Sequence, residues 1–448
     1  MNYLGFQISL RYYLASNYDG DGMNQSFLEQ TNISVAYAGF YKDNNLLLQS
    51  SSGGVATELS SAILNDGGIV YGAIYADDYY SCHYMRVTRQ ADLDRLKGSK
   101  YVYVEKKVIY ENEFISVFEA VQKDIENSKK VLFIGLSCDV AALMKWFEGK
   151  NINPESLYTI ELLCDGVTCE CVHQDYIKKL ETVHNSKVVS FTVRNKRDGW
   201  TPLYIMAEFD NGETHVVPFY NSVYGYAFLH YKKKACYGCQ FKQKNRFADL
   251  TIGDFWGCEE GMKEYNRNGV SIIYVQTEKG QEMLESIKND SFVIMETDAE
   301  FALRHSPRYF NAHSFNKNWE ELDNDISAIG LHQAVRKRMV CNPSERAAWN
   351  PNMNIILWGT GNCFHKLAPV VIENSNVMFA VDTDPQKWGS LTEYGILCKS
   401  PEEILKLDNV FVIIMIENAS IVCQVIQTIL DMNVRYFDQV NNWIYNNV

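Results

Sequence analysis

Apolar residues along the chain alternate between short runs typical of strands and longer stretches with helical spacing. VLFIGLSC (131–138) and LYTIELLC (157–164) both predict buried strands that end in a thiol. Between them, CDVAALMKWFE (138–148) has the apolar spacing of a helix. Strand–helix–strand alternation is typical of an α/β sheet, in which ligands collect beyond the carboxyl ends of the strands.

Further segments have the periodicity of strands or helices. SVAYAGF (34–40) and LLLQS (46–50) predict two strands around a KDNN turn, and ATELSSAILNDGG (56–68) predicts a helix. Residues 188–220 predict several strands, and residues from about 280 to 340 predict a mainly helical stretch. The expected fold class is therefore α/β, with a mixed sheet in the main domain.

A new strand–glycine–helix pattern begins at NIILWGTGN (354–362). Gly361 and Asp382 are 21 residues apart, close to the spacing between a Rossmann glycine loop and its ribose-binding acid, although Phe364 replaces the third glycine. The pattern predicts a small Rossmann-like α/β domain. Such a domain either binds a nucleotide or sugar nucleotide, or serves for docking or structure.

These patterns divide the chain into four parts. The segment CNPSERAAWNPN has the composition of a linker. The expected parts are an N-terminal extension (1–33), a main domain (34–340, with an N-terminal part over about 34–130 and a C-terminal part over 131–310), a linker (341–352) and a Rossmann-like accessory domain (353–448).

Composition and charge narrow the functional classes. The formal charge of −13 over 448 residues argues against a nucleic-acid partner. No stretch approaches about 18 consecutive apolar residues, so we expect no membrane span. The first residues lack the basic leader of a signal peptide, which favours a cytoplasmic location, where thiols stay reduced.

Twelve cysteines are many for such a protein. Five solitary ones are expected to be buried apolar residues: Cys82, Cys341, Cys363, Cys398 and Cys423. Four others could act together, two at predicted strand ends and two in CYGC: Cys138, Cys164, Cys236 and Cys239. Four thiolates suit an iron–sulfur cluster, but spacing alone leaves structural zinc or a redox-active CxxC pair open.

Seven motifs, in this order and spacing, resemble a known family. They are SSSGG (50–54), GSKYVY (98–103), VLFIGLSCDVAAL (131–143), CDGV (164–167), RDGW (197–200), CYGC (236–239) and DLTIGDFWG (249–257). From about Ser34 to residue 310 the chain resembles the beta-subunit family of coenzyme F420 hydrogenases and dehydrogenases. Bacterial relatives of that family also occur in polysaccharide-biosynthesis loci.

The resemblance implies FAD and one 4Fe–4S cluster as cofactors. Matching motifs assign the cluster to Cys138, Cys164, Cys236 and Cys239. They assign FAD contacts to Ser52, Gly53, Gly54, Gly98, Ser99, Lys100 and Tyr101. SSSGG suits a phosphate because glycines permit close backbone approach and a helix begins directly after it, yet alone it is equally a plain turn. No catalytic residue is assigned, since His83, Asp254 and Trp256 are equally explained by structural roles.

Two departures from the family pattern concern the cluster. Ser137 replaces the usual proline before the first cysteine, and Asp165 replaces the frequent histidine after the second. An acid close to a cluster would lower its potential. Residues 1–81 contain no cysteine, so the ferredoxin-like segment of many relatives is not expected there, and electrons would come from an external donor.

A lysine run (Lys232–Lys234) stands directly before CYGC, and Lys242, Lys244 and Arg246 follow it. It predicts docking of an acidic ferredoxin-like carrier, or otherwise a solvated loop. The alternative donor is a reduced deazaflavin.

The function expected from sequence is that of an iron–sulfur flavoprotein oxidoreductase acting on a small or sugar-derived substrate in surface polysaccharide or sugar-precursor biosynthesis. The alternatives are a non-catalytic interaction or scaffold protein that keeps the fold, and a zinc-stabilised transferase.

Overall fold

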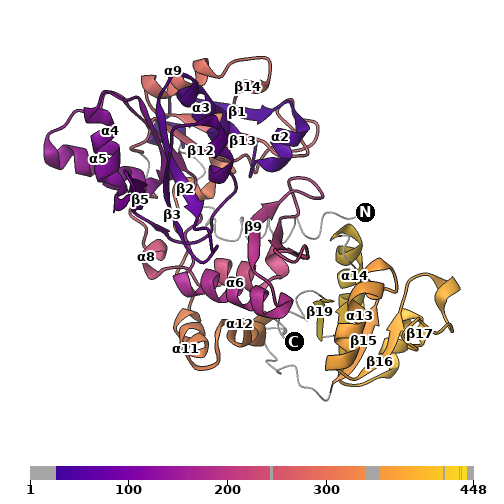
Figure 1. Ribbon diagram of the computed structural model, residues 1–448. Coiled ribbons are helices and arrows are strands. Elements are labelled where there is room, and N and C mark those ends of the chain that lie inside the picture. Colours follow the sequence, from indigo (N-terminus) through magenta and orange to yellow (C-terminus); the bar gives the residue numbers. More distant parts are fainter. Residues whose placement is uncertain are drawn as a thin grey trace.

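The computed structural model describes residues 27–242, 246–339, 353–416, 419–432, 434 and 436–440 (Figure 1). A nine-stranded sheet dominates the first part of the chain, a three-stranded sheet lies beside it, and a five-stranded sheet belongs to the C-terminal residues. No helix in these ranges is long and apolar enough to cross a membrane.

The nine-stranded sheet is mixed, as expected. In sheet order its strands are β14 (Phe292–Thr297), β1 (Val35–Tyr41), β13 (Ser271–Val275), β12 (Leu250–Asp254), β8 (Leu157–Leu162), β7 (Val131–Leu136), β2 (Ile69–Tyr75), β3 (Cys82–Val87) and β4 (Val104–Glu105). The central strands β12, β8, β7 and β2 are parallel, and antiparallel strands flank them. The carboxyl ends of β7 and β8 therefore meet at one edge, where the first two candidate thiols follow.

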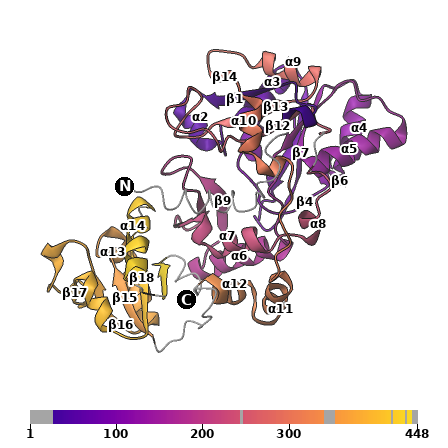
Figure 2. The ribbon, with the colours of Figure 1, turned by 180° about the vertical axis from the view of Figure 1, so that it is seen from behind.

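Helices cover both faces of this sheet (Figure 2). Neighbouring residues of β7 point to opposite faces. Leu132 packs in a core with α3 (Val55–Asn65) and α9 (Glu278–Ser286), whereas Phe133 packs in a core with α4 (Val117–Glu126) and α5 (Ser137–Lys150). Helix α10 (Ala299–Arg304) also belongs to this region. Burial on both faces explains the continuous apolar runs of the central strands.

A second core surrounds the three-stranded sheet. Its strands and helices are β9 (Val188–Asn195), β10 (Tyr204–Phe209), β11 (Thr214–Pro218), α6 (Glu170–His184), α7 (Val223–His230), α11 (Trp319–Ile329) and α12 (Leu331–Met339). The strands expected over 188–220 are thus confirmed. The stretch expected to be mainly helical also contains β14, an edge strand of the large sheet. Short elements complete this part of the chain: η2 (Leu28–Gln30), η3 (Gln90–Leu96), β5 (Lys107–Tyr110), β6 (Glu113–Ser116), η4 (Phe219–Asn221), α8 (Lys234–Tyr237) and η5 (Pro307–Tyr309).

One predicted strand is wrong. LLLQS belongs to α2 (Asn44–Gln49), because the Asp43 carboxylate accepts hydrogen bonds from the backbone N–H groups of Asn45 (2.7 Å) and Leu46 (3.4 Å). This N-cap starts a helix at the position read as a turn. Of the three leucines, only Leu47 is buried.

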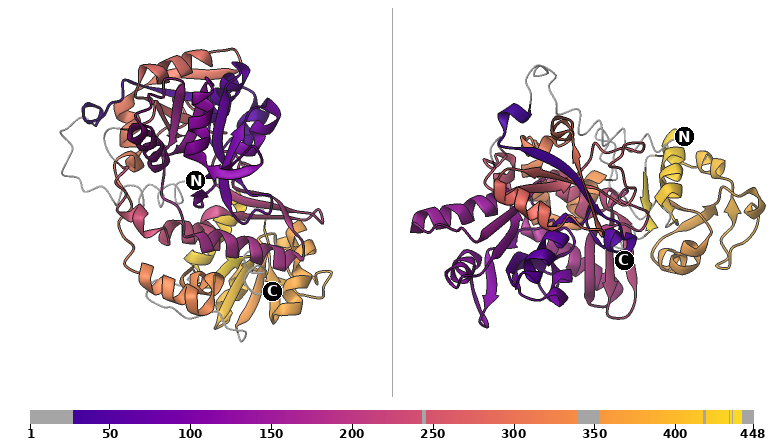
Figure 3. Two further views of the ribbon diagram at one scale, coloured as in Figure 1. Left: turned by 60° about the vertical axis from the view of Figure 1, so that its left-hand side comes forward. Right: turned by 90° about the horizontal axis from the view of Figure 1, so that it is seen from above.

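The C-terminal residues form a separate parallel sheet (Figure 3). Its order is β17 (Cys398–Lys399), β16 (Val377–Val381), β15 (Asn354–Trp358), β18 (Val410–Ile414) and β19 (Tyr436–Gln439), with helices α13 (Asn362–Asn374) and α14 (Ala419–Asp431). This order is that of a Rossmann half, which confirms the expected module. The expected linker at 341–352 lies outside the described residues.

The acid expected to bind ribose in this module already has protein partners. The Asp382 carboxylate accepts hydrogen bonds from the Thr360 N–H (2.9 Å) and hydroxyl (2.6 Å), and Lys387 Nζ lies at 2.8 Å. Burial would raise the pKa of Asp382, but Lys387 and Thr360 lower it to about 2. Asp382 therefore fixes its own glycine loop.

Candidate flavin and cluster site

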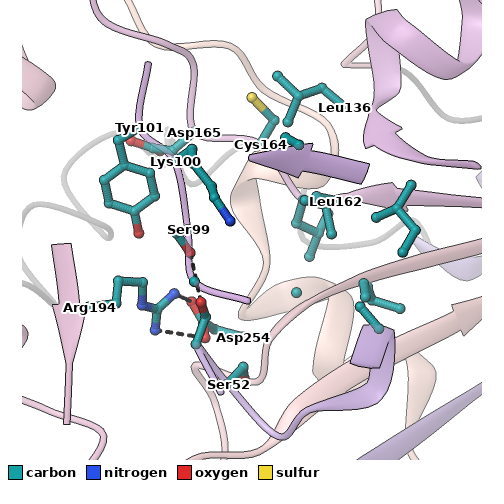
Figure 4. Close-up of a pocket in the computed structure, with 18 of the residues that line it drawn as sticks. Ser52, Ser99, Lys100, Tyr101, Leu136, Leu162, Cys164, Asp165, Arg194 and Asp254 are labelled. Carbon is teal, nitrogen blue, oxygen red and sulfur yellow. Dashed lines mark hydrogen bonds and ion pairs between the residues drawn. The ribbon is translucent and has the colours of Figure 1, made fainter. Parts of the chain in front are cut away.

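A cavity of about 390 Å³ lies beside the carboxyl ends of β7 and β8 (Figure 4). Six of the seven residues expected to contact FAD line it: Ser52, Gly54, Gly98, Ser99, Lys100 and Tyr101. Leu136, Leu162, Cys164 and Asp165 also line the cavity. Two loops far apart in sequence thus face the strand end that carries a candidate cluster ligand.

The SSSGG loop enters the first turn of α3. Gly54 is the N-cap residue, no side chain caps the helix, and Val55–Thr57 line the cavity. Uncapped N–H groups and the positive end of a helix dipole are suited to a phosphate. Ser99 Oγ donates to Ser51 Oγ at 3.1 Å, which joins this loop to the GSKYVY loop. The two expected FAD motifs therefore form one wall.

Gly53 does not line the cavity. Its N–H donates to Ser271 Oγ (2.9 Å), and a Cβ atom added there would lie 1.9 Å from the Gly39 carbonyl oxygen of β1. The need for glycine at this position thus comes from packing on β1. Ser52 is anchored nearby, because its carbonyl accepts a hydrogen bond from Lys196 Nζ at 2.6 Å.

Lys100 has a structural partner as well as a place in the cavity wall. Its Nζ donates to the carbonyls of Leu96 (2.9 Å) and Lys97 (2.6 Å) at the end of η3. Burial lowers the pKa of Lys100 to about 8. This lysine holds the GSKYVY loop against η3.

Sequence reasoning missed Arg194 of β9. Its guanidinium forms a two-point ion pair with Asp254, with Nη1 at 2.6 Å and Nη2 at 2.9 Å from the carboxylate oxygens (Figure 4). Trp200 Nε1 donates to Asp254 at 3.2 Å, and the Trp200 ring stacks on Trp256. Arg194, Asp254 and Trp256 all line the cavity. The sequence did contain a signal for Arg194, since it is a charged residue within the mostly apolar strand VVSFTVRN.

The four candidate thiols come from three segments. Cys138 is the second residue of α5, Cys164 follows β8, and α8 contains Cys236, with Cys239 after it. All four are free and partly exposed. Burial raises the pKa of Cys138, and Asp139, Cys164 and Cys239 raise it further. Burial likewise raises the pKa of Cys164, Lys242 and the Gly166 N–H lower it, and Cys236 raises it. Each thiol is therefore an electrostatic neighbour of at least one other.

Two sequence profiles of one family match the chain. The profile of the coenzyme F420 hydrogenase/dehydrogenase beta subunit N-terminus matches residues 36–108, and that of the C terminus matches residues 128–300. The chain belongs to this family. The resemblance inferred from the motifs is thereby confirmed, and the four thiols all fall within the C-terminal match.

Two proteins similar to this chain have low sequence identity to it. The F420-dependent formate dehydrogenase subunit beta of Methanocaldococcus jannaschii is 22% identical over 266 residues, which are 58% of this chain and 62% of the relative. The match thus spans less than two thirds of that relative. A chain of the F420-reducing NiFe hydrogenase complex from Methanosarcina barkeri aligns with a TM-score of 0.43 and 15% identity, over 66% of this chain and 94% of that chain.

In this chain the segments that carry Cys164 and Cys236 lie close to each other. Gly166 has φ of +98°, and a Cβ added there would lie 3.3 Å from the Cys236 Cβ. The Gly166 N–H donates to Cys164 Sγ at 3.2 Å, an interaction that favours a thiolate. Within the described ranges, no three His, Cys, Asp or Glu side chains are grouped closely enough to hold a metal ion. The soft sulfur donors suit a cluster, and the ligand assignment stays a prediction.

Asp165, which replaces the family's frequent histidine, is paired with two cations and a histidine. Lys232 Nζ lies 3.0 Å from its carboxylate, Arg308 Nε 2.9 Å and His313 Nε2 2.8 Å. Burial would raise the pKa of Asp165, but Lys232, His313 and Arg308 hold it well below its usual value. The expected effect of an acid on a neighbouring cluster is therefore largely compensated here.

The lysine run is paired within the chain. Lys232 is fully buried against Asp165, whereas Lys233 pairs with Glu170 and Lys234 with Glu320, each at 2.7 Å. Lys242 Nζ donates to the Cys164 carbonyl, and buried Arg246 pairs with Glu161. Lys244 lies outside the described residues. The run is therefore not the free positive surface that the sequence predicted for an acidic carrier.

The cysteines expected to be solitary follow the prediction where their side chains are described. Cys82, Cys363 and Cys398 are buried, as is Cys258. Cys341 and the Cys423 side chain lie outside the described residues.

Proposed function

We propose that the chain is an iron–sulfur flavoprotein oxidoreductase that couples single-electron transfer through a 4Fe–4S cluster to hydride chemistry on FAD. One observation carries the proposal: Cys164 lies in the wall of the cavity and has Cys138 and Cys236 as electrostatic neighbours. A cluster held by Cys138, Cys164, Cys236 and Cys239 would then adjoin a flavin in the cavity. Family membership supports the iron–sulfur oxidoreductase class.

The residues suited to FAD are those of the two facing loops. The first turn of α3 offers backbone N–H groups to a diphosphate. Ser52 and Ser99 fix the two loops, because their hydroxyls donate to the Val270 carbonyl (2.8 Å) and to Ser51 Oγ (3.1 Å). Gly53 and Gly54 shape the loop, while Gly98, Lys100 and Tyr101 form the adjoining wall. Flavin supplies exchange between hydride and single electrons, and the cluster supplies single-electron transfer. Leu136 and Leu162 make the strand-end wall apolar, which limits water beside the reacting ring.

The physiological setting we propose is a redox step in surface polysaccharide or sugar-precursor biosynthesis, in the cytoplasm. An external donor, either a ferredoxin-like protein or a reduced deazaflavin, would supply the electrons. Support comes from the resemblance to bacterial relatives in polysaccharide loci. The substrate is then a small or sugar-derived molecule.

The test is the cofactor content of anaerobically purified protein, with Cys239→Ala and Cys258→Ala as a matched pair. Cys258 is buried in another core cluster of the main domain. We expect flavin and iron in the parent, little iron in Cys239→Ala, and parental iron in Cys258→Ala, since cluster binding depends on its thiolates.

Three results would contradict the proposal in different ways. Equal iron in the two variants removes the ligand assignment. Zinc in place of iron favours the zinc-stabilised transferase. A protein with neither flavin nor metal favours the non-catalytic scaffold. The visible absorption spectrum separates flavin from iron–sulfur absorption in the same sample.

A further inference from the structure

One corner of the cavity is built around a buried arginine. Both terminal nitrogens of Arg194 donate to Asp254. Only 8% of Arg194 is exposed, and its Nε is buried out of reach of a ligand in the cavity. The ion pair therefore holds the guanidinium in the cavity wall, and the groups beside it decide which ligand this corner accepts.

Two phenols adjoin this guanidinium. The Tyr101 hydroxyl points toward Arg194 (Figure 4), and Tyr220 also lines the cavity. Burial raises the pKa of both tyrosines, and Arg194 opposes the rise in each. Both hydroxyls therefore stay protonated and able to donate near neutral pH. Tyr101 and Tyr220, beside the Arg194 guanidinium, thus form a corner that donates hydrogen bonds.

The charge of this corner limits which ligand suits it. Arg194 and Asp254 neutralise each other at hydrogen-bond distance. Asp165, the other acid that acts on Tyr220, is paired with Lys232, Arg308 and His313. A multiply charged phosphate is stabilised by unpaired cations, which this corner does not supply. A carbonyl, or a carboxylate with one charge, requires mainly hydrogen-bond donors.

The corner also adjoins a residue that solvent reaches. Trp256 lines the cavity and is 36% exposed. One face of its indole stacks on Trp200, with ring centroids 5.2 Å apart and planes 4° apart. The Arg194 guanidinium carbon lies 5.9 Å from the centroid of the Trp256 ring. A substrate must enter and leave in each turnover, whereas a tightly bound flavin stays, so a position beside exposed Trp256 favours the substrate.

We propose that Tyr101 and Tyr220, with Arg194 as the positioning residue beside them, form the substrate subsite of this cavity and bind a carbonyl or carboxylate oxygen of a small organic substrate. The proposal rests on the proposed function, because it places this substrate beside the flavin. It goes further by naming the substrate class, a 2-oxo acid or another small carboxylate. Trp256 then flanks the bound molecule on the solvent side.

The probe is sodium pyruvate, which has both oxygen types, titrated against sodium chloride at equal ionic strength. The flavin absorption spectrum and the melting temperature are recorded for the parent, Tyr101→Phe, Tyr220→Phe and Arg194→Lys. Tyr103→Phe is the matched control, since Tyr103 belongs to the same loop but does not line the cavity. Arg194→Lys keeps the positive charge beside Asp254. Flavin dissociation constants are measured for all five proteins.

We expect saturable pyruvate binding in the parent and in Tyr103→Phe. Loss of one hydroxyl weakens it roughly 3- to 10-fold, because a hydrogen bond contributes about 0.5–1.5 kcal/mol. Flavin affinity stays at the parental value in Tyr220→Phe, because Tyr220 lies outside the two loops proposed to hold the flavin. Reduced flavin affinity with unchanged pyruvate binding would assign the corner to the flavin and overturn the proposal. Absence of saturable pyruvate binding in the parent would also overturn it.

The same experiment distinguishes failure of the proposed function from failure of the substrate subsite. If the parent holds no flavin, pyruvate binding is read from the melting temperature alone. A pyruvate-dependent rise that the corner variants lose would keep the carboxylate subsite and discard the flavoprotein. No rise in the parent would discard the subsite as well.

Discussion

Lys232 and Lys234 stand two residues apart, yet their charges should differ greatly in their effect on stability. Lys232 is fully buried and pairs with Asp165, whereas the side chains of Lys234 and Glu320 are 54% and 62% exposed. Lys232→Met removes one partner of a buried ion pair and leaves the carboxylate partly desolvated. Lys234→Met makes the same change in an exposed pair.

The expected magnitudes follow from these environments. Loss of one partner of a buried pair costs about 3–5 kcal/mol. Asp165 keeps Arg308 and His313 and its side chain is 34% exposed, so the cost of Lys232→Met should fall to the lower limit of this range or just below it, about 2–3 kcal/mol. Lys234→Met should cost about 0–1 kcal/mol. A loss of 1 kcal/mol lowers the melting temperature of a domain of 150–250 residues by about 2–4 °C. The melting temperature should therefore fall by about 4–12 °C in Lys232→Met and by at most about 4 °C in Lys234→Met.

The assay is thermal unfolding of the anaerobic holoprotein in low and high salt. Salt should remove what difference Lys234→Met makes, because exposed charges are screened, and should leave most of the Lys232→Met effect. Asp165→Asn combined with Lys232→Met should recover part of the loss, since no uncompensated carboxylate remains. Equal effects of the two lysine variants, or a Lys232→Met effect abolished by salt, would refute the reasoning.

Three further outcomes are expected. Gly53→Ala should lower the melting temperature, because the added Cβ clashes with the Gly39 carbonyl. Ser99→Ala should keep the fold and weaken flavin binding roughly 3- to 10-fold, measured by fluorescence titration. The reverse pattern would contradict the proposed flavin site. Burial lowers the pKa of His173 to about 4, so below about pH 6.5 the unfolded chain binds a proton that the folded chain does not bind. The free energy of unfolding should therefore fall by about 2 kcal/mol as the pH is lowered from 7 to 5, and it should fall less in His173→Gln. Because the lysine run is internally paired, stopped-flow reduction by an acidic ferredoxin should respond weakly to salt; a steep fall with salt would contradict this.

The main sheet was predictable because its signal is local. In the parallel centre, β7 and β2 are continuous apolar runs and β8 is mostly apolar, so the position of Cys138 and Cys164 after two such strands needed no tertiary information. The error at α2 has an equally local cause. Periodicity favoured a strand over LLLQS, but the side chain of Asp43 caps a helix, and a capping residue outweighs a run of three leucines.

The electrostatics of the site were not predictable because each partner lies far along the chain. Asp165 is 67 residues from Lys232 and 148 from His313, and Glu320 is 86 residues from Lys234. Sequence shows three adjacent lysines and suggests one positive surface. Only the fold shows that these lysines point to different acids, so the net charge near CYGC depends on packing.

This pairing changes how the two expected electron donors can be told apart. A carrier attracted by charge would have met the lysine run, but in the described residues that run is neutralised by neighbouring acids. A protein carrier must therefore approach the partly exposed Cys236 and Cys239 through contacts other than these charges. A small reduced deazaflavin would instead enter the cavity beside exposed Trp256, where the proposed substrate subsite lies. Two small molecules that use one opening must take turns, whereas a docked protein leaves the opening free. Pyruvate should therefore compete with a small donor and leave reduction by a protein carrier unchanged, and this difference, unlike salt dependence, follows from the shape of the cavity.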